Sequence, residues 1–104
     1  MYKVLYLDKV ENDISEAKHW YAEQQQGLEI RFTKAVKETL MRILKMPTAY
    51  NVRYKNVRIA HTKTFPYNVH FYIDYEQMQI VIIGIVHNKR NDAIFLNRQY
   101  TSFQ

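Results

Sequence analysis

The chain has 104 residues, no Cys, two Gly and a formal charge of +5. Its length predicts one domain over residues 1–104, and its 47% apolar share excludes a disordered segment. The absence of Cys excludes a disulfide framework and a thiolate metal site. No apolar run approaches the roughly 20 residues that span a bilayer. We therefore expect a cytoplasmic protein with no membrane partner.

The positive charge is concentrated in the second half of the chain. Residues 1–50 hold eight basic and seven acidic side chains, whereas residues 51–104 hold seven basic and three acidic ones. An excess of cations favours contact with a polyanion, so the second half is the better place to look for function. A charge of this size is equally compatible with a well-dissolved surface.

The first predicted elements are a short strand and a helix. Residues 2–7 are rich in Val, Leu and Tyr, which favours a strand. Asp8 and Glu11 have the spacing of a capping box, which predicts that a helix begins there. Gly27 marks the end of this helix. Its apolar face is formed, at helical spacing, by Val10, Ile14, Ala17 and Tyr21.

A second helix is predicted from Leu28 to Met46. Pro47 ends it, because proline cannot continue a helix. The short connection between the two helices predicts an antiparallel hairpin. The apolar stripe of the second helix consists of Leu28, Phe32, Val36, Leu40 and Ile43.

The hydrophobic period then changes to two, which predicts strands at 57–62, 67–74 and 79–87. The last of these is apolar on both faces and should be a central strand. The three strands form an antiparallel meander, and the helical hairpin covers one face of it. The predicted fold is therefore α+β, in the order β-α-α-β-β-β. In the last strand, alternation assigns one face to Ile80, Ile82 and Val86 and the other to Val81, Ile83 and Ile85.

Cations and tyrosines are interleaved in the second half of the chain. Cations bind phosphates and aromatic faces stack on unpaired bases, so this combination suits single-stranded RNA. The alternative is that Tyr is simply a good strand residue with a polar end. The residues concerned are Arg53, Lys55, Arg58, Lys63, Lys89, Arg90 and Arg98, with Tyr54, Tyr67, Tyr72, Tyr75 and Tyr100.

The histidines of the strand region do not have the spacing of a metal site. Neither H-x-H nor H-x-x-x-H occurs, so we expect no metal and no cofactor. His87 lies at the end of the central strand, beside Lys89 and Arg90, whose charges favour a neutral imidazole. It is therefore either a general acid or base or a structural histidine.

The sequence also lacks the motifs of several enzyme classes. It has no GxSxG, GxGxxG or HExxH, and two glycines in total exclude a glycine-rich phosphate loop. What remains is metal-free cationic chemistry. RNA strand cleavage needs a base for the 2′-OH, cations for the phosphate and an acid for the leaving oxygen, and Lys, Arg, Tyr and His can fill these roles.

Several segments in order resemble one protein family. They are Trp20-Tyr21, Gly27-Leu28, Arg31-Phe32, Pro47-x-x-Tyr50, Val52-Arg53-Tyr54, Val57-Arg58, Phe65-Pro66-Tyr67, Phe71-Tyr72 and His87-Asn88-Lys89-Arg90. Their order and spacing resemble the RelE/ParE toxin superfamily, most closely its ParE-like plasmid stabilisation members. The resemblance extends over about residues 2–98, and that family's fold has the order reached above from periodicity.

The resemblance implies the toxin of a bacterial type II toxin–antitoxin pair. Such toxins are neutralised by a cognate antitoxin, whose C-terminal segment wraps the toxin. The RelE-like branch cuts mRNA in the ribosome, whereas the ParE-like branch is associated with poisoning of DNA gyrase. Whether this chain is an enzyme stays open. Toxin homodimers and toxin–antitoxin heterotetramers are both compatible with the sequence.

The resemblance also implies site residues. The basic residues of the family's central strands correspond to Arg58 and Lys63, and its post-strand Arg to Lys89 or Arg90. A late Tyr of the ribonuclease branch falls on or near Phe95, which has no hydroxyl. This departure weakens the case for RelE-type cleavage, although His87 could take over the proton transfer. The candidate site is therefore Arg58, Lys63, His87, Lys89 and Arg90.

Two further expectations concern the aromatics and toxicity. Large aromatics at helical spacing are usually part of the core, so we interpret the aromatic motif residues as fold markers. A domain that keeps the toxin fold without toxicity, binding nucleic acid or protein, is the alternative function. The fold markers are Trp20, Tyr21, Phe32, Phe65, Pro66 and Tyr67.

Overall fold

The computed structural model describes residues 2–90, with Arg90 described by its backbone alone. The predicted polar tail after residue 90 and Phe95 lie outside the described residues. The elements are β1 (Lys3–Tyr6), α1 (Asp8–Gln24), α2 (Leu28–Lys45), the 3-10 turn η1 (Pro47–Ala49), β2 (Val52–Tyr54), β3 (Val57–His61), β4 (Tyr67–Asp74), β5 (Gln79–His87) and the 3-10 turn η2 (Asn88–Arg90). The predicted order is confirmed, with β2 as an additional short strand.

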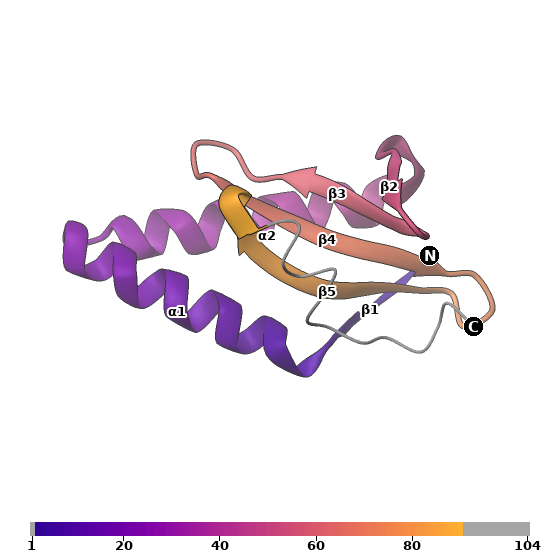
Figure 1. The fold of residues 1–104 in the computed structure, drawn as a ribbon, viewed down its shortest axis with the longest axis horizontal. Helices are drawn as coiled ribbons and strands as arrows, with labels where there is room; N and C mark the ends of the chain where they lie inside the picture. The colour runs from indigo at the N-terminus through magenta and orange to yellow at the C-terminus, as the bar shows by residue number, and fades with distance from the viewer. Residues whose placement is uncertain (1, 91–104) are drawn as a thin grey trace.

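The strands form one five-stranded sheet in the order β1-β5-β4-β3-β2. Neighbouring strands are antiparallel except for β1 and β5, which are parallel. The hairpin of α1 and α2 lies against one face of the sheet, and the two helices run in opposite directions (Figure 1). The α+β fold class and the antiparallel-rich sheet are therefore confirmed.

Helix α1 begins at the predicted residue, but its N-terminus is not capped in the predicted way. The helix begins at Asp8, yet Leu7 is the N-cap and no side chain caps the helix, so the predicted capping box is wrong. At the other end, Gly27 has a φ of +88° between the two helices. This left-handed conformation is one that residues with a Cβ rarely adopt, which explains why glycine occupies the turn.

Replacing Gly27 by Ala should lower the free energy of unfolding by about 1 kcal/mol, because the strain comes from the backbone and no neighbouring atom lies within 4 Å of the new Cβ. Urea unfolding followed by circular dichroism measures the change. Gly27→Asn is the matched control, since Asn tolerates the left-handed region better. Equal stability of the Ala and glycine proteins would contradict this explanation.

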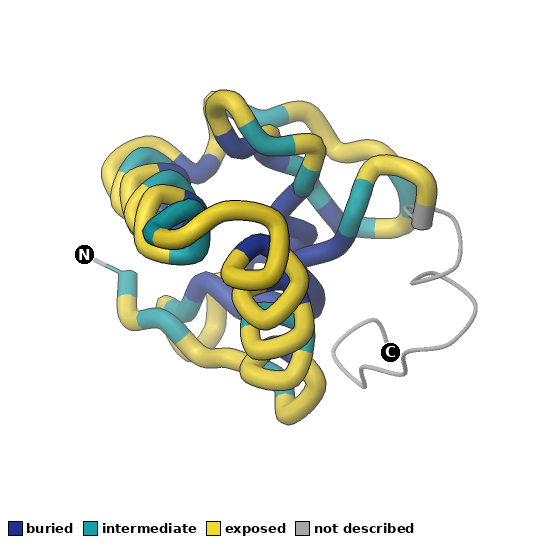
Figure 2. Tube along the Cα trace, turned by 90° about the vertical axis from the view of Figure 1, so that its left-hand side faces the viewer, coloured by how far each residue is buried: buried dark blue, intermediate teal, exposed yellow. Residues whose placement is uncertain are grey.

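The main core lies between the helices and the sheet. The predicted faces of both helices are confirmed, because their central residues are buried while the opposite sides are exposed (Figure 2). Thr39 is also buried and satisfies its hydroxyl by donating to the Ala35 carbonyl at 2.8 Å. The buried residues of this core are Val10, Ala17, Tyr21, Phe32, Val36, Ile43, Ala60, Val69, Phe71, Ile73, Ile80, Ile82 and Ile85.

A β-bulge in β5 changes which side chains face the helices. His70 pairs with Gly84 but the next β4 residue, Phe71, pairs with Ile82, which leaves Ile83 as an extra residue. The strand therefore reverses its alternation after this point. Ile85 faces the helices together with Ile80 and Ile82, whereas Val86 belongs to the second cluster on the opposite face with Val57, Tyr72, Val81 and Ile83. The predicted assignment of Ile85 and Val86 is thus wrong.

Candidate functional site

Two chain segments that are distant in sequence meet at one end of the sheet. Tyr67 pairs with His87, and the Asn88 N–H donates to the Pro66 carbonyl at 2.8 Å. The segment 62–66 therefore lies against the segment 87–90, and we call these two segments the loop end. The loop end carries Lys63 and Lys89, both exposed. It brings together three of the predicted site residues, since His87 also belongs to it.

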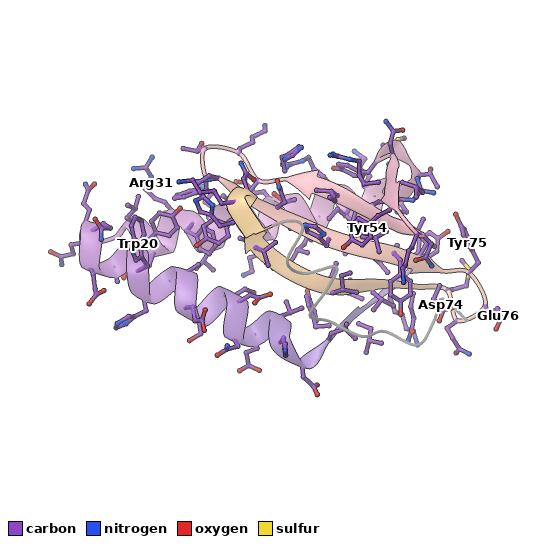
Figure 3. The ribbon with its side chains drawn as sticks, viewed as in Figure 1. Trp20, Arg31, Tyr54, Asp74, Tyr75 and Glu76 are labelled. Carbon is purple, nitrogen blue, oxygen red and sulfur yellow. The ribbon has the colours of Figure 1, made fainter. Side chains whose placement is uncertain are left out.

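A cleft of about 530 Å³ lies beside the loop end, between α1 and the last residues of β5. One wall is α1, with Asp13, Trp20 and the buried Tyr21; the other includes His87 and Lys89. Trp20 is 54% exposed, so its assignment to the core is wrong. Figure 3 shows Trp20 on α1, at the same end of the molecule as the loop end.

Asp13 connects the two walls of the cleft. β1 pairs with β5 only as far as Ile82, so the edge of β5 beyond that residue faces α1. There the Ile85 N–H donates to Asp13 Oδ2 at 3.0 Å. This bond satisfies a backbone donor that would otherwise be unpaired at the edge, and it fixes α1 against the end of the strand.

The hydrogen bonding of His87 limits its chemistry. Its Nδ1 accepts a hydrogen bond from the Lys89 backbone N–H at 3.1 Å, and its ring centroid lies 5.4 Å from that of Tyr67. A neutral imidazole that accepts at Nδ1 carries its proton on Nε2. In this arrangement His87 offers a ligand a hydrogen-bond donor and not a general base.

Tyr21 and Tyr67 line the cleft and belong to an aromatic cluster of the core. The rings of Tyr21, Phe32, Phe65 and Tyr67 contact one another with centroid separations between 5.0 and 6.1 Å. Burial raises the pKa of the Tyr21 hydroxyl above its ordinary value, and Tyr67 raises it further. Tyr21 therefore stays neutral at physiological pH. These four residues fulfil the structural role predicted for them.

The raised pKa of Tyr21 predicts a loss of stability in alkali. The folded state holds the phenol proton more tightly than the unfolded state, so its contribution is complete below the ordinary Tyr pKa of about 10 and is lost as the pH rises above it. In Tyr21→Phe the free energy of unfolding should fall less between neutral and alkaline pH. The exposed Tyr75→Phe is the control, and an identical pH dependence in both variants would contradict the prediction.

Arg58 does not join the loop end. It shares a face of β3 with the buried Ala60, and its guanidinium donates to the Tyr50 carbonyl on the helix side of the sheet. Arg58 pairs with Phe71, four ladder positions away from the Tyr67–His87 pair along β4. It is half-buried and ties the chain after η1 to the sheet. The Arg90 side chain lies outside the described residues.

The opposite face of the sheet carries two polar pairs. His61 Nδ1 contacts Asn68 Oδ1, and the Tyr54 hydroxyl lies 3.0 Å from His70 Nδ1. His70 is fully buried, and its ring is held by this contact. Between residues 2 and 90 no three His, Asp or Glu side chains converge as metal ligands. The three strand histidines thus have different partners and do not form one site.

Charged side chains lie at both ends of the sheet. Lys63 and Lys89 belong to the loop end, whereas Asp74 and Glu76 lie at the β4–β5 turn, at the other end of the sheet (Figure 3).

Sequence reasoning missed Asp13 as a member of the site. The available signal was its helical spacing, since Asp13 lies three residues after Val10 and four before Ala17, beside the buried face.

A family model described as "ParE toxin of type II toxin-antitoxin system, parDE" matches residues 4–92, well over half of the chain. The chain belongs to the ParE toxin family. Its resemblance to the RelE/ParE superfamily is thereby confirmed. No curated protein is significantly similar to it in sequence. Between residues 2 and 90, neither helix is long and apolar enough to cross a membrane.

Solved structures share the fold of this ParE-family chain. A chain from "Chromosomal ParDE TA system from P. aeruginosa" matches with a TM-score of 0.70 at 15% identity, over 84% of this chain and 96% of that one. The isolated E. coli RelE toxin matches with a TM-score of 0.59 at 13% identity, over 92% and 98%. A chain of the intact E. coli RelBE toxin–antitoxin complex also has a TM-score of 0.59 at 13% identity, over 84% and 96%.

Proposed function

We propose that the chain is the toxin of a type II toxin–antitoxin pair, that a cognate antitoxin neutralises it, and that it inhibits DNA gyrase by binding without cutting RNA. Its membership of the ParE family supports the toxin role. The similar folds in ParDE and RelBE systems support a protein antitoxin as the partner. These two observations support the toxin role and the antitoxin partner but do not distinguish between the possible targets. The choice of target depends on the geometry of the site.

The observation that carries the choice of target is the position of Arg58. Metal-free RNA cleavage needs cations, a base and an acid around one phosphate. Arg58 is bonded to the Tyr50 carbonyl on the helix side, whereas Lys63, His87 and Lys89 lie at the loop end. The predicted catalytic group is thus divided between two places, which favours binding over catalysis.

The hydrogen bonding of His87 and the raised pKa of Tyr21 favour the same choice. His87 uses Nδ1 to accept from the Lys89 N–H, and Tyr21 has a raised pKa. Neither group offers a lone pair suited to removing a 2′-OH proton at neutral pH. The exposed cations Lys63 and Lys89 remain available to attract a polyanionic surface such as the DNA-bound gyrase complex.

Expression of the chain alone in bacteria tests the toxin role. We expect growth to stop and the SOS response to rise, and we expect co-expression of the antitoxin encoded beside it to restore growth. Induction of SOS separates gyrase inhibition from mRNA cleavage, which stops growth without damaging DNA. Normal growth with abundant, soluble, folded protein would support the alternative of a non-toxic binding domain and would contradict the proposal.

A further inference from the structure

Among residues 2–90, β1 is an edge strand, and no strand pairs with its outer side. The Lys3 N–H donates to the Met78 carbonyl and the Leu7 N–H to the Ile82 carbonyl, each at 3.0 Å. Odd-numbered residues therefore direct their backbone groups towards β5. Because this direction alternates along a strand, Val4 and Tyr6 direct their N–H and C=O groups away from the sheet.

The side chains beside this edge are unusually apolar for exposed positions. Leu5 is 45% exposed and Tyr6 is 48% exposed, and β1 itself contains neither a bulge nor a proline. Natural proteins generally protect such edges, since unpaired backbone groups next to apolar side chains promote pairing with another strand. Lys3, at the start of the strand, is the one charged residue of β1.

The geometry points to a second copy of this chain as the partner of β1, paired antiparallel about a two-fold axis at Leu5. In this register Val4 of each copy lies opposite Tyr6 of the other, and each such pair exchanges both backbone hydrogen bonds. The two Leu5 residues face each other as a non-hydrogen-bonded pair, in which side chains come closest. The two sheets become one continuous sheet.

Charge complementarity favours a second copy over other extended segments. Lys3 stands at one end of β1 and Asp8 follows the other end. In this register Lys3 of one copy lies opposite Leu7 of the second copy, the residue before Asp8, so the symmetry brings these opposite charges near each other twice. The segment is thus complementary to itself in backbone pattern, apolar centre and charge. Nucleic acid is disfavoured, because the centre of the strand is apolar.

The pairing involves few residues, so the dimer should be weak. Interfaces well below about 1,200 Å² belong to weak and transient complexes. We therefore expect a dissociation constant in the roughly micromolar range or above. The inference does not depend on the target, and it would stand if the toxin acted on a protein other than gyrase.

A single introduced cysteine gives the sharpest test, since the natural chain has none. In the non-hydrogen-bonded pair the two Cα atoms of residue 5 lie about 4.5 Å apart, which falls within the roughly 4.4–6.8 Å range of disulfides. With oxidised glutathione, Leu5→Cys should form a disulfide-linked dimer rapidly. Met41→Cys, on the exposed side of α2, is the matched control and should not.

Sedimentation of the full chain over a concentration series provides the second measurement. The wild type should dimerise, whereas Tyr6→Pro, which removes an outward N–H and no bond to β5, should weaken the dimer by roughly tenfold or more. Leu5→Lys places like charges opposite each other and should do the same. Circular dichroism establishes that both variants are folded.

Three results would overturn the inference. The first is a wild-type chain that stays monomeric at roughly millimolar concentration. The second is Leu5→Cys cross-linking no faster than Met41→Cys. The third is a dimer that persists unchanged in folded Leu5→Lys and Tyr6→Pro, which would place the interface elsewhere. An antitoxin segment that pairs with β1 while the isolated chain stays monomeric would likewise assign this edge to another partner.

Discussion

The double variant Lys63→Glu/Lys89→Glu should inhibit the target roughly 100-fold less strongly than the wild type, if each reversal removes about 1.4 kcal/mol of binding free energy. Both side chains are exposed at the loop end, where the segments 62–66 and 87–90 meet. Reversal replaces attraction to a polyanionic surface by repulsion. Supercoiling assays with purified gyrase, and survival after expression, measure the effect.

The matched control changes the same net charge elsewhere. Lys34 and Lys37 are exposed on α2, away from the cleft, so Lys34→Glu/Lys37→Glu should stay close to wild-type inhibition. Neither double variant should alter the melting temperature appreciably, because exposed charges contribute little to stability. Equal loss of inhibition in both variants would show that total charge acts, and would remove the loop end from the mechanism.

Phe32→Ala should lower the free energy of unfolding by about 3–5 kcal/mol. The ring is fully buried in the main core. It contacts Tyr21, Phe65 and Tyr67 at centroid distances of 5.2, 5.4 and 5.1 Å. Truncation leaves a cavity beside Tyr21 and Tyr67, which line the cleft. Since domains of this size are stable by only about 5–15 kcal/mol, toxicity should fall with the folded population.

Two further variants serve as controls for this prediction. Phe32→Leu should be less destabilising than Phe32→Ala, because it fills part of the cavity. Trp20→Ala should change stability little, since that side chain is more than half exposed. Chemical unfolding of the three variants measures the differences. A loss below about 1 kcal/mol in Phe32→Ala would mean that the aromatic cluster is not the centre of the core.

The helices and the long strands could be predicted because their apolar residues have a clear period. Val10, Ala17 and Tyr21 repeat at helical spacing, and Tyr67 to Asp74 alternates. β2 was missed because it has only three residues, of which two are exposed. The bulge in β5 was missed because nearly all residues from Ile80 to Val86 are apolar. A change in which residues face the helices therefore does not alter the sequence of apolar and polar residues.

The site could be predicted only in part. His87 and Lys89 were found because they are two residues apart at the end of a strand, and residues so close in sequence must lie close in space. Arg58 was misplaced because a strand directs neighbouring residues to opposite faces, and the sequence does not say which face the helices cover. Arg58 lies two residues before Ala60 and therefore on the same face of β3. That this face is the one covered by the helices is known only from the position of Ala60 in the core.

Two parallel assays with increasing amounts of the chain test the central claim most directly. One measures supercoiling of relaxed plasmid by purified gyrase, and the other measures cleavage of an mRNA in a translating extract. Inhibition by binding at the loop end predicts that supercoiling is lost while the mRNA stays intact, and that the antitoxin restores supercoiling. Full supercoiling together with cleaved mRNA would contradict it, and would mean that Arg58 and His87 rearrange into a catalytic group.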